Sequence, residues 1–156
     1  MEATRRKMRL SHQINGHFCG PAAAVTALSA YGIHTTQRAL ARLARTNKAT
    51  GTSTKGLVLA LRSFGVHVRA KNGCTLSEIR QALPTSTIIV CYTESRSEAG
   101  HYAVVAGFKR EHMLLLDPDR RGKRPVRLTL SEFRNRWKDE RLTRSKRWAA
   151  FIARKA

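Results

Sequence analysis

The hydrophobic period of the chain changes near its middle, and this change constrains the fold more than any other feature. Three segments in the first half carry apolar residues at helical spacing, residues 21–31, 37–45 and 53–64. Gly32 and Gly65 follow the first and third segments, at positions where glycine commonly ends a helix. The first half of the chain therefore predicts three helices.

The second half carries strand patterns. Residues 87–93 form an apolar run, residues 101–108 alternate, and residues 113–117 follow after a polar turn. Residues 66–70 and 148–152 predict two further strands, at the beginning and the end of this region. Helices that precede antiparallel strands predict a segregated α+β fold.

Two capping boxes interrupt the strand region. Residues 75–78 and 129–132 both read Thr-Leu-Ser-Glu. At a helix start, the hydroxyl of the Thr can accept the backbone N–H of the Glu, and the carboxylate of the Glu can accept the backbone N–H of the Thr. The first box predicts a short helix that ends at Pro84, and the second predicts a helix that continues to Trp137.

Length and composition predict a single domain over residues 1–156, in which residues 1–10 form a basic N-terminal extension. An apolar fraction of 42% argues against wholesale disorder. No apolar run approaches the ~20 residues of a membrane span. No hydrophobic segment follows the basic extension, and three cysteines cannot all pair, so we expect a reduced, cytoplasmic protein.

The charge is the most unusual bulk property. Thirty Lys and Arg residues face ten Asp and Glu residues, which gives a formal net charge of +20. Such an excess attracts nucleic acid and other polyanions through a long-range field. The basic residues are dispersed along the chain, however, and a solvated charged surface is the alternative interpretation.

Cys19 stands apart from the other two cysteines. Cys91 lies in an apolar run and is predicted to be a buried structural thiol, whereas Cys74 follows a turn. Cys19, Gly20 and Pro21 directly precede a predicted helix, whose unpaired amides and dipole are expected to stabilise a thiolate. Gly20 is expected to leave room for a substrate backbone. A small core residue is the alternative role for a single cysteine.

Three polar residues occupy positions that suit a thiol nucleophile. His101 begins an alternating strand, and Asp117 ends the next strand, so a hairpin brings both to one end of a sheet. Gln13 lies six residues before Cys19, where its amide can donate to an oxyanion beside the Cys19 amide. Each residue considered alone also has an ordinary structural role as the alternative: a histidine in a strand, an aspartate that opens a turn, and a glutamine on the surface.

The pattern as a whole resembles the C39 family of papain-like cysteine peptidases, which includes the double-glycine leader peptidases of bacteriocin exporters. The segments that carry the resemblance are residues 13–21 (Gln-Ile-Asn-Gly-His-Phe-Cys-Gly-Pro), 100–105 (Gly-His-Tyr-Ala-Val-Val) and 115–118 (Leu-Leu-Asp-Pro). It extends over about residues 11–152. The resemblance implies a papain-like fold, in which a helical lobe carries the cysteine and an antiparallel sheet carries the histidine and aspartate.

The resemblance also implies the roles of the site residues. Cys19 becomes the nucleophile, His101 the general base and acid, Asp117 the residue that orients His101, and Gln13 the oxyanion donor. Hydrolysis of a peptide or protein substrate through a thioester is then expected, with no cofactor and no metal. Cleavage after a Gly-Gly pair is an expectation taken from the family.

Other interpretations remain open. Exporter members of the family continue into membrane spans and an ATP-binding domain. The sequence of this chain predicts neither, so we expect a stand-alone domain. The same thioester can serve a transamidase. The +20 charge and the basic cluster at residues 120–124 favour a non-enzymatic nucleic-acid or anionic-surface binder, although aromatic residues make up only 6% of the chain. A metal site from His12, His17 and Cys19 fits no familiar ligand spacing.

Overall fold

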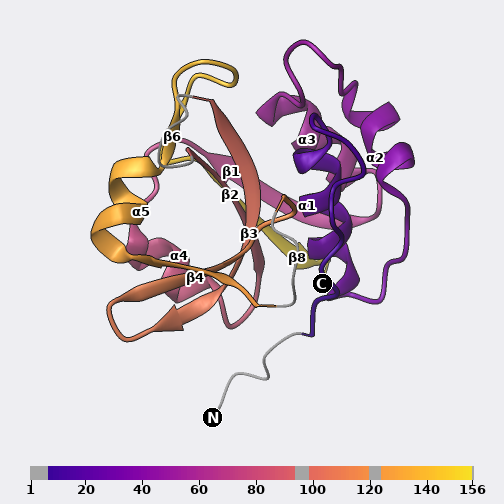
Figure 1. Ribbon diagram of the computed structural model, residues 1–156. Coiled ribbons are helices and arrows are strands. Elements are labelled where there is room, and N and C mark those ends of the chain that lie inside the picture. Colours follow the sequence, from indigo (N-terminus) through magenta and orange to yellow (C-terminus); the bar gives the residue numbers. More distant parts are fainter. Residues whose placement is uncertain (1–6, 94–98, 120–123, 156) are drawn as a thin grey trace.

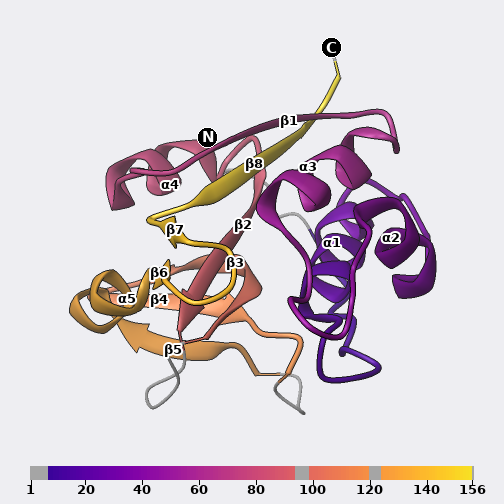
Figure 2. The ribbon, with the colours of Figure 1, turned by 90° about the horizontal axis from the view of Figure 1, so that it is seen from above.

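The computed structural model describes residues 7–93, 99–119 and 124–155 (Figure 1). Most of the N-terminal extension and residues 120–123 of the basic cluster lie outside this described part. Helices α1, α2 and α3 gather on one side of a β-sheet, and α4 and α5 lie on its other side (Figures 1 and 2). The predicted α+β fold, with helices followed by an antiparallel sheet, is confirmed.

The elements follow one another as the periodicity predicted, with additions in the last third. The helices are α1 (Cys19–Ser29), α2 (Gln37–Ala44), α3 (Thr54–Arg62), α4 (Leu76–Ala82) and α5 (Leu130–Arg136). The strands are β1 (Val66–Lys71), β2 (Thr87–Thr93), β3 (Gly100–Lys109), β4 (His112–Leu116), β5 (Val126–Thr129), β6 (Lys138–Asp139), β7 (Ser145–Lys146) and β8 (Ala149–Arg154). None of the helices in the described part of the chain is both long and apolar enough to cross a membrane.

The helix boundaries follow from local capping. The hydroxyls of Thr36 and Ser53 accept backbone N–H groups at the starts of α2 and α3, and both predicted capping boxes form. The prediction that α1 begins at Pro21 is wrong. The helix begins at Cys19, after a cap at Phe18 that makes no side-chain hydrogen bond. Cys19 therefore lies within the first helical turn.

The six-stranded sheet has the order β1-β8-β2-β3-β4-β5, and its pairs are antiparallel. The last strand of the chain, β8, inserts between β1 and β2, which the sequence did not predict. Strands β5, β6 and β7 were not predicted either, because they have only four, two and two residues. The hairpin of β3 and β4 places the residues at the start of β3 beside the end of β4.

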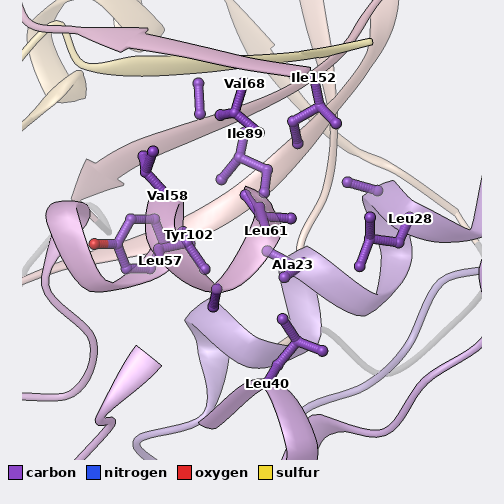
Figure 3. Packing of buried hydrophobic residues seen from close by; sticks show 14 of the residues in the cluster. Ala23, Leu28, Leu40, Leu57, Val58, Leu61, Val68, Ile89, Tyr102 and Ile152 are labelled. Carbon is purple, nitrogen blue, oxygen red and sulfur yellow. The ribbon is translucent and has the colours of Figure 1, made fainter. Parts of the chain in front are cut away.

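Two hydrophobic cores occupy the two faces of the sheet. Side chains of β2 alternate between them: Ile89 and Cys91 face α1–α3, whereas Ile88, Val90 and Tyr92 face α4 and α5. Figure 3 shows Leu28, Leu40, Leu57 and Leu61 of the three helices packed toward Val68, Ile89 and Ile152 of the sheet. This face fixes the helical layer, and hence Cys19, against β3.

Arg45 ends α2 in the left-handed conformation, with φ 56° and ψ 41°. A side chain at such a φ is strained, and glycine is the usual residue there. We expect Arg45→Gly to raise the free energy of unfolding by about 0.5–1 kcal/mol, the strain removed less the extra chain entropy of glycine. Urea unfolding followed by tryptophan fluorescence measures this change.

Arg42→Gly is the matched control, because Arg42 lies inside α2 and is also exposed. Glycine within a helix costs about 1 kcal/mol. The two substitutions remove the same charge from the same helix and should shift the unfolding midpoint in opposite directions. A loss of stability in both variants would contradict the assignment of strain to Arg45.

Candidate active site

A cleft of about 390 Å³ lies between the helical layer and the sheet. Cys19 from the start of α1 and His101 from the start of β3 line it together with Gln13. Lys48 and Leu142 form further parts of its wall. The structure therefore brings three of the four predicted site residues to one cleft, and the fourth, Asp117, is hydrogen-bonded to His101.

Asp117 holds His101 from behind. Its Oδ2 lies 2.5 Å from His101 Nε2 and also accepts the Tyr92 hydroxyl, while its Oδ1 accepts the Asp119 N–H at 2.9 Å. Burial opposes ionisation of Asp117, but these hydrogen bonds and the nearby His101 lower its pKa below the ordinary value. Asp117 is thus an anionic partner that fixes the orientation of the imidazole.

Tyr92 was not predicted as part of this arrangement. It pairs with His101 across β2 and β3, and the two rings lie 4.6 Å apart. Its hydroxyl reaches the same carboxylate oxygen that His101 uses. In the sequence, Tyr92 is one residue of a continuous apolar run, so only the strand register indicates its place.

The expected stabilisation of a Cys19 thiolate is not what the structure shows. Burial raises the pKa of Cys19 to about 11. The backbone of Tyr102 and the N–H groups at the start of α1 act in the opposite direction, and the negative charge of Asp117 adds to the increase. Desolvation thus outweighs the helix terminus, so the pKa of the Cys19 thiol lies above its ordinary value.

This raised pKa predicts how Cys19 reacts with a small alkylating agent. Because only the thiolate reacts, the rate of iodoacetamide addition to Cys19 should rise about tenfold per pH unit from pH 6 to pH 10. Peptide mass spectrometry measures the rate at Cys19 alone. N-acetylcysteine in the same buffers is the control. As the pH rises, its reaction rate should stop increasing at a lower pH than the rate at Cys19 does. A fast rate at Cys19 that does not change from pH 6 upward would contradict the raised pKa.

Gly20 does not provide room for a substrate, which corrects the expectation from the sequence. It is buried, and a Cβ at this position would lie 2.8 Å from the Thr52 hydroxyl oxygen and 3.2 Å from the Tyr102 ring. The Tyr102 hydroxyl donates to the Thr52 carbonyl at 2.7 Å. Gly20 is therefore needed for close packing that fixes the start of α1, and so Cys19, beside His101.

Gln13 is held near Cys19 at two points. Its backbone N–H donates to the carbonyl of Pro118 at 3.0 Å, which ties its segment to the residue after Asp117. Its side-chain Nε2 donates to the Asn15 carbonyl at 2.9 Å. An amide nitrogen carries two protons, so the bond to Asn15 leaves one N–H of Gln13, a residue of the cleft lining, available as a donor.

Asp139 holds Leu142, a residue of the cleft wall, and no pattern in the sequence singles it out. Its buried carboxylate accepts the backbone N–H groups of Arg141, Leu142 and Thr143. Burial opposes its ionisation, yet these bonds and one from Gly100 lower its pKa. A Cβ on Gly100 would lie 2.5 Å from Asp139 Cβ, so glycine is required before His101.

The metal site weighed for His12, His17 and Cys19 finds no support. Within residues 7–93, 99–119 and 124–155, no three His, Cys, Asp or Glu side chains come together in a way that could hold a metal ion. The three cysteines are free thiols. Cys91 is buried, as predicted, and so is Cys74.

Comparisons with known proteins identify the family and the fold of this chain. The family model described as Peptidase C39 family matches residues 7–148. An uncharacterized protein of Methanothermobacter marburgensis is 35% identical over 68% of this chain and 68% of its own length. The peptidase domain of Streptococcus ComA, a bifunctional ABC transporter of a quorum-sensing pathway, is 26% identical, with a TM-score of 0.76 over 96% of this chain and 100% of that domain.

A double-glycine-motif protease from an AMS/PCAT transporter, solved in complex with a leader peptide, shares the fold. Its TM-score is 0.75 at 16% identity, over 97% of this chain and 94% of the other. The family match covers most of the chain, including all four residues of the candidate site. The chain belongs to the peptidase C39 family.

Proposed function

We propose that this protein is a cysteine peptidase in which Cys19, His101 and Asp117 carry out hydrolysis of a peptide bond. The observation that supports it most directly is the 2.5 Å hydrogen bond between His101 and Asp117 at the cleft that Cys19 also lines. A nucleophile, a base and a group that orients the base are the parts that this chemistry requires.

Acylation begins with a neutral thiol. Since Asp117 holds Nε2 of His101, proton transfer from Cys19 falls to Nδ1, and the sulfur attacks the substrate carbonyl as it loses its proton. The negative charge that develops on the carbonyl oxygen is stabilised by the Cys19 N–H and by Nε2 of Gln13. His101 then protonates the leaving amine, and an acyl thioester remains on Cys19.

Deacylation reverses these roles. His101 takes a proton from water, which attacks the thioester, and the thiol of Cys19 is restored with release of a carboxylate. An amine in place of water gives a transamidase from the same intermediate. Asp117 stays ionised throughout, because its lowered pKa lies well below neutral pH.

We further propose that the substrates include peptides with a Gly-Gly pair before the cleaved bond. Support comes from the relatives, since one similar structure is a double-glycine-motif protease bound to a leader peptide. The cleft of this chain also contains residues with little or no side chain on both sides, Gly51 and Gly100 among them. An extended segment with small side chains suits a cleft lined in this way.

Incubation with a synthetic leader-type peptide that contains Gly-Gly tests the proposal. We expect mass spectrometry to find a product that ends at Gly-Gly, and a peptide aldehyde of the same sequence to add reversibly to Cys19. If the aldehyde adds but another bond is cut, the Gly-Gly specificity is wrong. If neither cleavage nor addition to Cys19 occurs, the proposal of a peptidase fails.

A further inference from the structure

A second pocket, the side pocket, opens beside the candidate active site. Its volume is about 530 Å³. The residues that line the side pocket are 12–16, Pro118 and Asp119. Gln13, Gly16 and Asp119 also line the active-site cleft, so the two spaces adjoin. Residues 48–51 of the helical layer line the cleft but not the side pocket.

Asp119 places a carboxylate where the two spaces meet. Among the described residues that line either space, it is the one acidic residue, and it is exposed. Glu78, Glu132 and Glu140 each form an ion pair with a Lys or Arg side chain. In the described part of the chain Asp119 forms no such pair, although the sequence carries 30 Lys and Arg residues. Its carboxylate is therefore available to a cation from outside the chain.

The main chain at Asp119 is fixed by the residues of the candidate site. Its N–H donates to Oδ1 of Asp117 at 2.9 Å, and Oδ2 of the same carboxylate lies 2.5 Å from Nε2 of His101. The preceding residue, Pro118, accepts the backbone N–H of Gln13 at 3.0 Å. The backbone of Asp119 is thus held beside the cleft, and these bonds do not use its side chain.

The side pocket lies on the side of the cleft from which the amine half of the substrate leaves. In the proposed reaction the acyl half stays on Cys19 as a thioester, and the amine half receives its proton from His101. Asp119 belongs to the same wall as His101, since Asp117 is hydrogen-bonded to both. We therefore expect the residues that follow the cleaved bond to lie toward Asp119.

We propose that Asp119 and Ile14 form a subsite for a lysine or arginine within the first two residues after the cleaved bond. Ile14 lines the side pocket and is 52% exposed, so it offers an apolar surface to the stem of such a side chain. The Asp119 carboxylate binds the cationic head where the pocket meets the cleft. This proposal rests on the proposed peptidase function and adds the chemistry of the leaving segment.

Competitive cleavage of paired peptides tests the proposal. The peptides share a Gly-Gly segment and carry either lysine or norleucine at the first or the second position after it. Norleucine keeps the four-carbon stem of lysine and lacks the ammonium group. Mass spectrometry of the products from one mixture gives the ratio of the two kcat/KM values. At one of the two positions we expect lysine to be favoured about threefold to fivefold, the gain of an exposed ion pair.

The net charge of the chain sharpens this measurement. A charge of +20 repels a cationic peptide at long range. A preference for lysine over norleucine therefore reports a local contact with a carboxylate and not a general attraction to the protein surface.

Matched substitutions locate the contact. Asp119→Asn keeps the backbone N–H that holds Asp117 and should abolish the lysine preference. Asp119→Lys should instead favour glutamate over norleucine at the same position. Glu111 is exposed in the turn at the other end of the β3–β4 hairpin, so Glu111→Gln and Glu111→Lys change the net charge equally and should preserve the lysine preference. Ile14→Ala should lower kcat/KM for the lysine and the norleucine peptides alike.

A binding measurement separates this proposal from the peptidase function. Fluorescence anisotropy of the same labelled peptides on the Cys19→Ala variant reports binding without cleavage, and lysine should be preferred there too. If no peptide is cleaved but Asp119→Asn removes this preference in binding, the subsite stands and the peptidase function fails. Cleavage at equal rates with lysine and norleucine, or a lysine preference that survives in Asp119→Asn, overturns the subsite and leaves the peptidase function standing. Equal binding without cleavage rejects both.

Discussion

Replacement of Cys19 by alanine is expected to reduce cleavage of a Gly-Gly peptide by about 10⁴-fold or more, because no other group at the cleft can form the thioester. The fold should persist. Cys19 is only partly buried and packs at the edge of the core below α1, and alanine keeps its Cβ. The experiment compares product formation by mass spectrometry with the circular dichroism spectrum and unfolding midpoint of the same samples.

Cys74→Ala is the control for this prediction. Cys74 is a buried thiol on the other face of the sheet, where it packs with Ile79, so its loss tests the effect of removing a thiol far from the cleft. We expect this variant to keep its activity, although a buried truncation costs about 1 kcal/mol of stability. Cleavage that survives in Cys19→Ala would end the assignment of Cys19 as nucleophile.

Many helices and strands could be predicted from local sequence patterns, because capping residues and apolar runs determine where these elements form. The two capping boxes and the uninterrupted run of β2 predicted three elements within a residue or two. The insertion of β8 between β1 and β2 was not predictable, because strand order depends on which apolar faces fit together over long sequence separations. The four-residue strand β5 forms only because β4 offers it an edge.

In the candidate site, too, the features set by local sequence were predictable and those set by long-range packing were not. His101 and Asp117 were predictable because a hairpin fixes which residues of two consecutive strands lie side by side. The pKa of Cys19 was not, because the amides of the helix terminus are visible in sequence, whereas the burial that outweighs them depends on how the helices pack against the sheet. Asp139 was not predicted for a related reason, since only its burial distinguishes it from an ordinary turn aspartate.

Asp117 has two opposing effects on the proposed chemistry. Its carboxylate holds His101 in position, and its charge stabilises the imidazolium that forms when Cys19 gives up a proton. The same charge contributes to the raised pKa of Cys19, because a thiolate near an anion is disfavoured. The arrangement therefore disfavours a thiolate at rest and stabilises proton transfer only once the sulfur has a carbonyl to attack.

The largest expected loss after that of Cys19 follows from His101. We expect His101→Ala to lower kcat by about 10³–10⁴-fold, since neither the thiol nor the leaving amine then has a proton carrier. Asp117→Asn should be milder, about 10–100-fold, because an amide oxygen can still accept from Nε2 and preserve the orientation of the ring.

The two variants should differ in a second measurement, the alkylation of Cys19. Removal of the Asp117 charge lowers the pKa of Cys19, so Asp117→Asn should react faster with iodoacetamide than wild type at the same pH while it cleaves peptide more slowly. Opposite changes in thiol reactivity and turnover would show that Asp117 acts through His101 rather than by activating the thiol. Slower alkylation together with slower turnover in Asp117→Asn would contradict this division of roles.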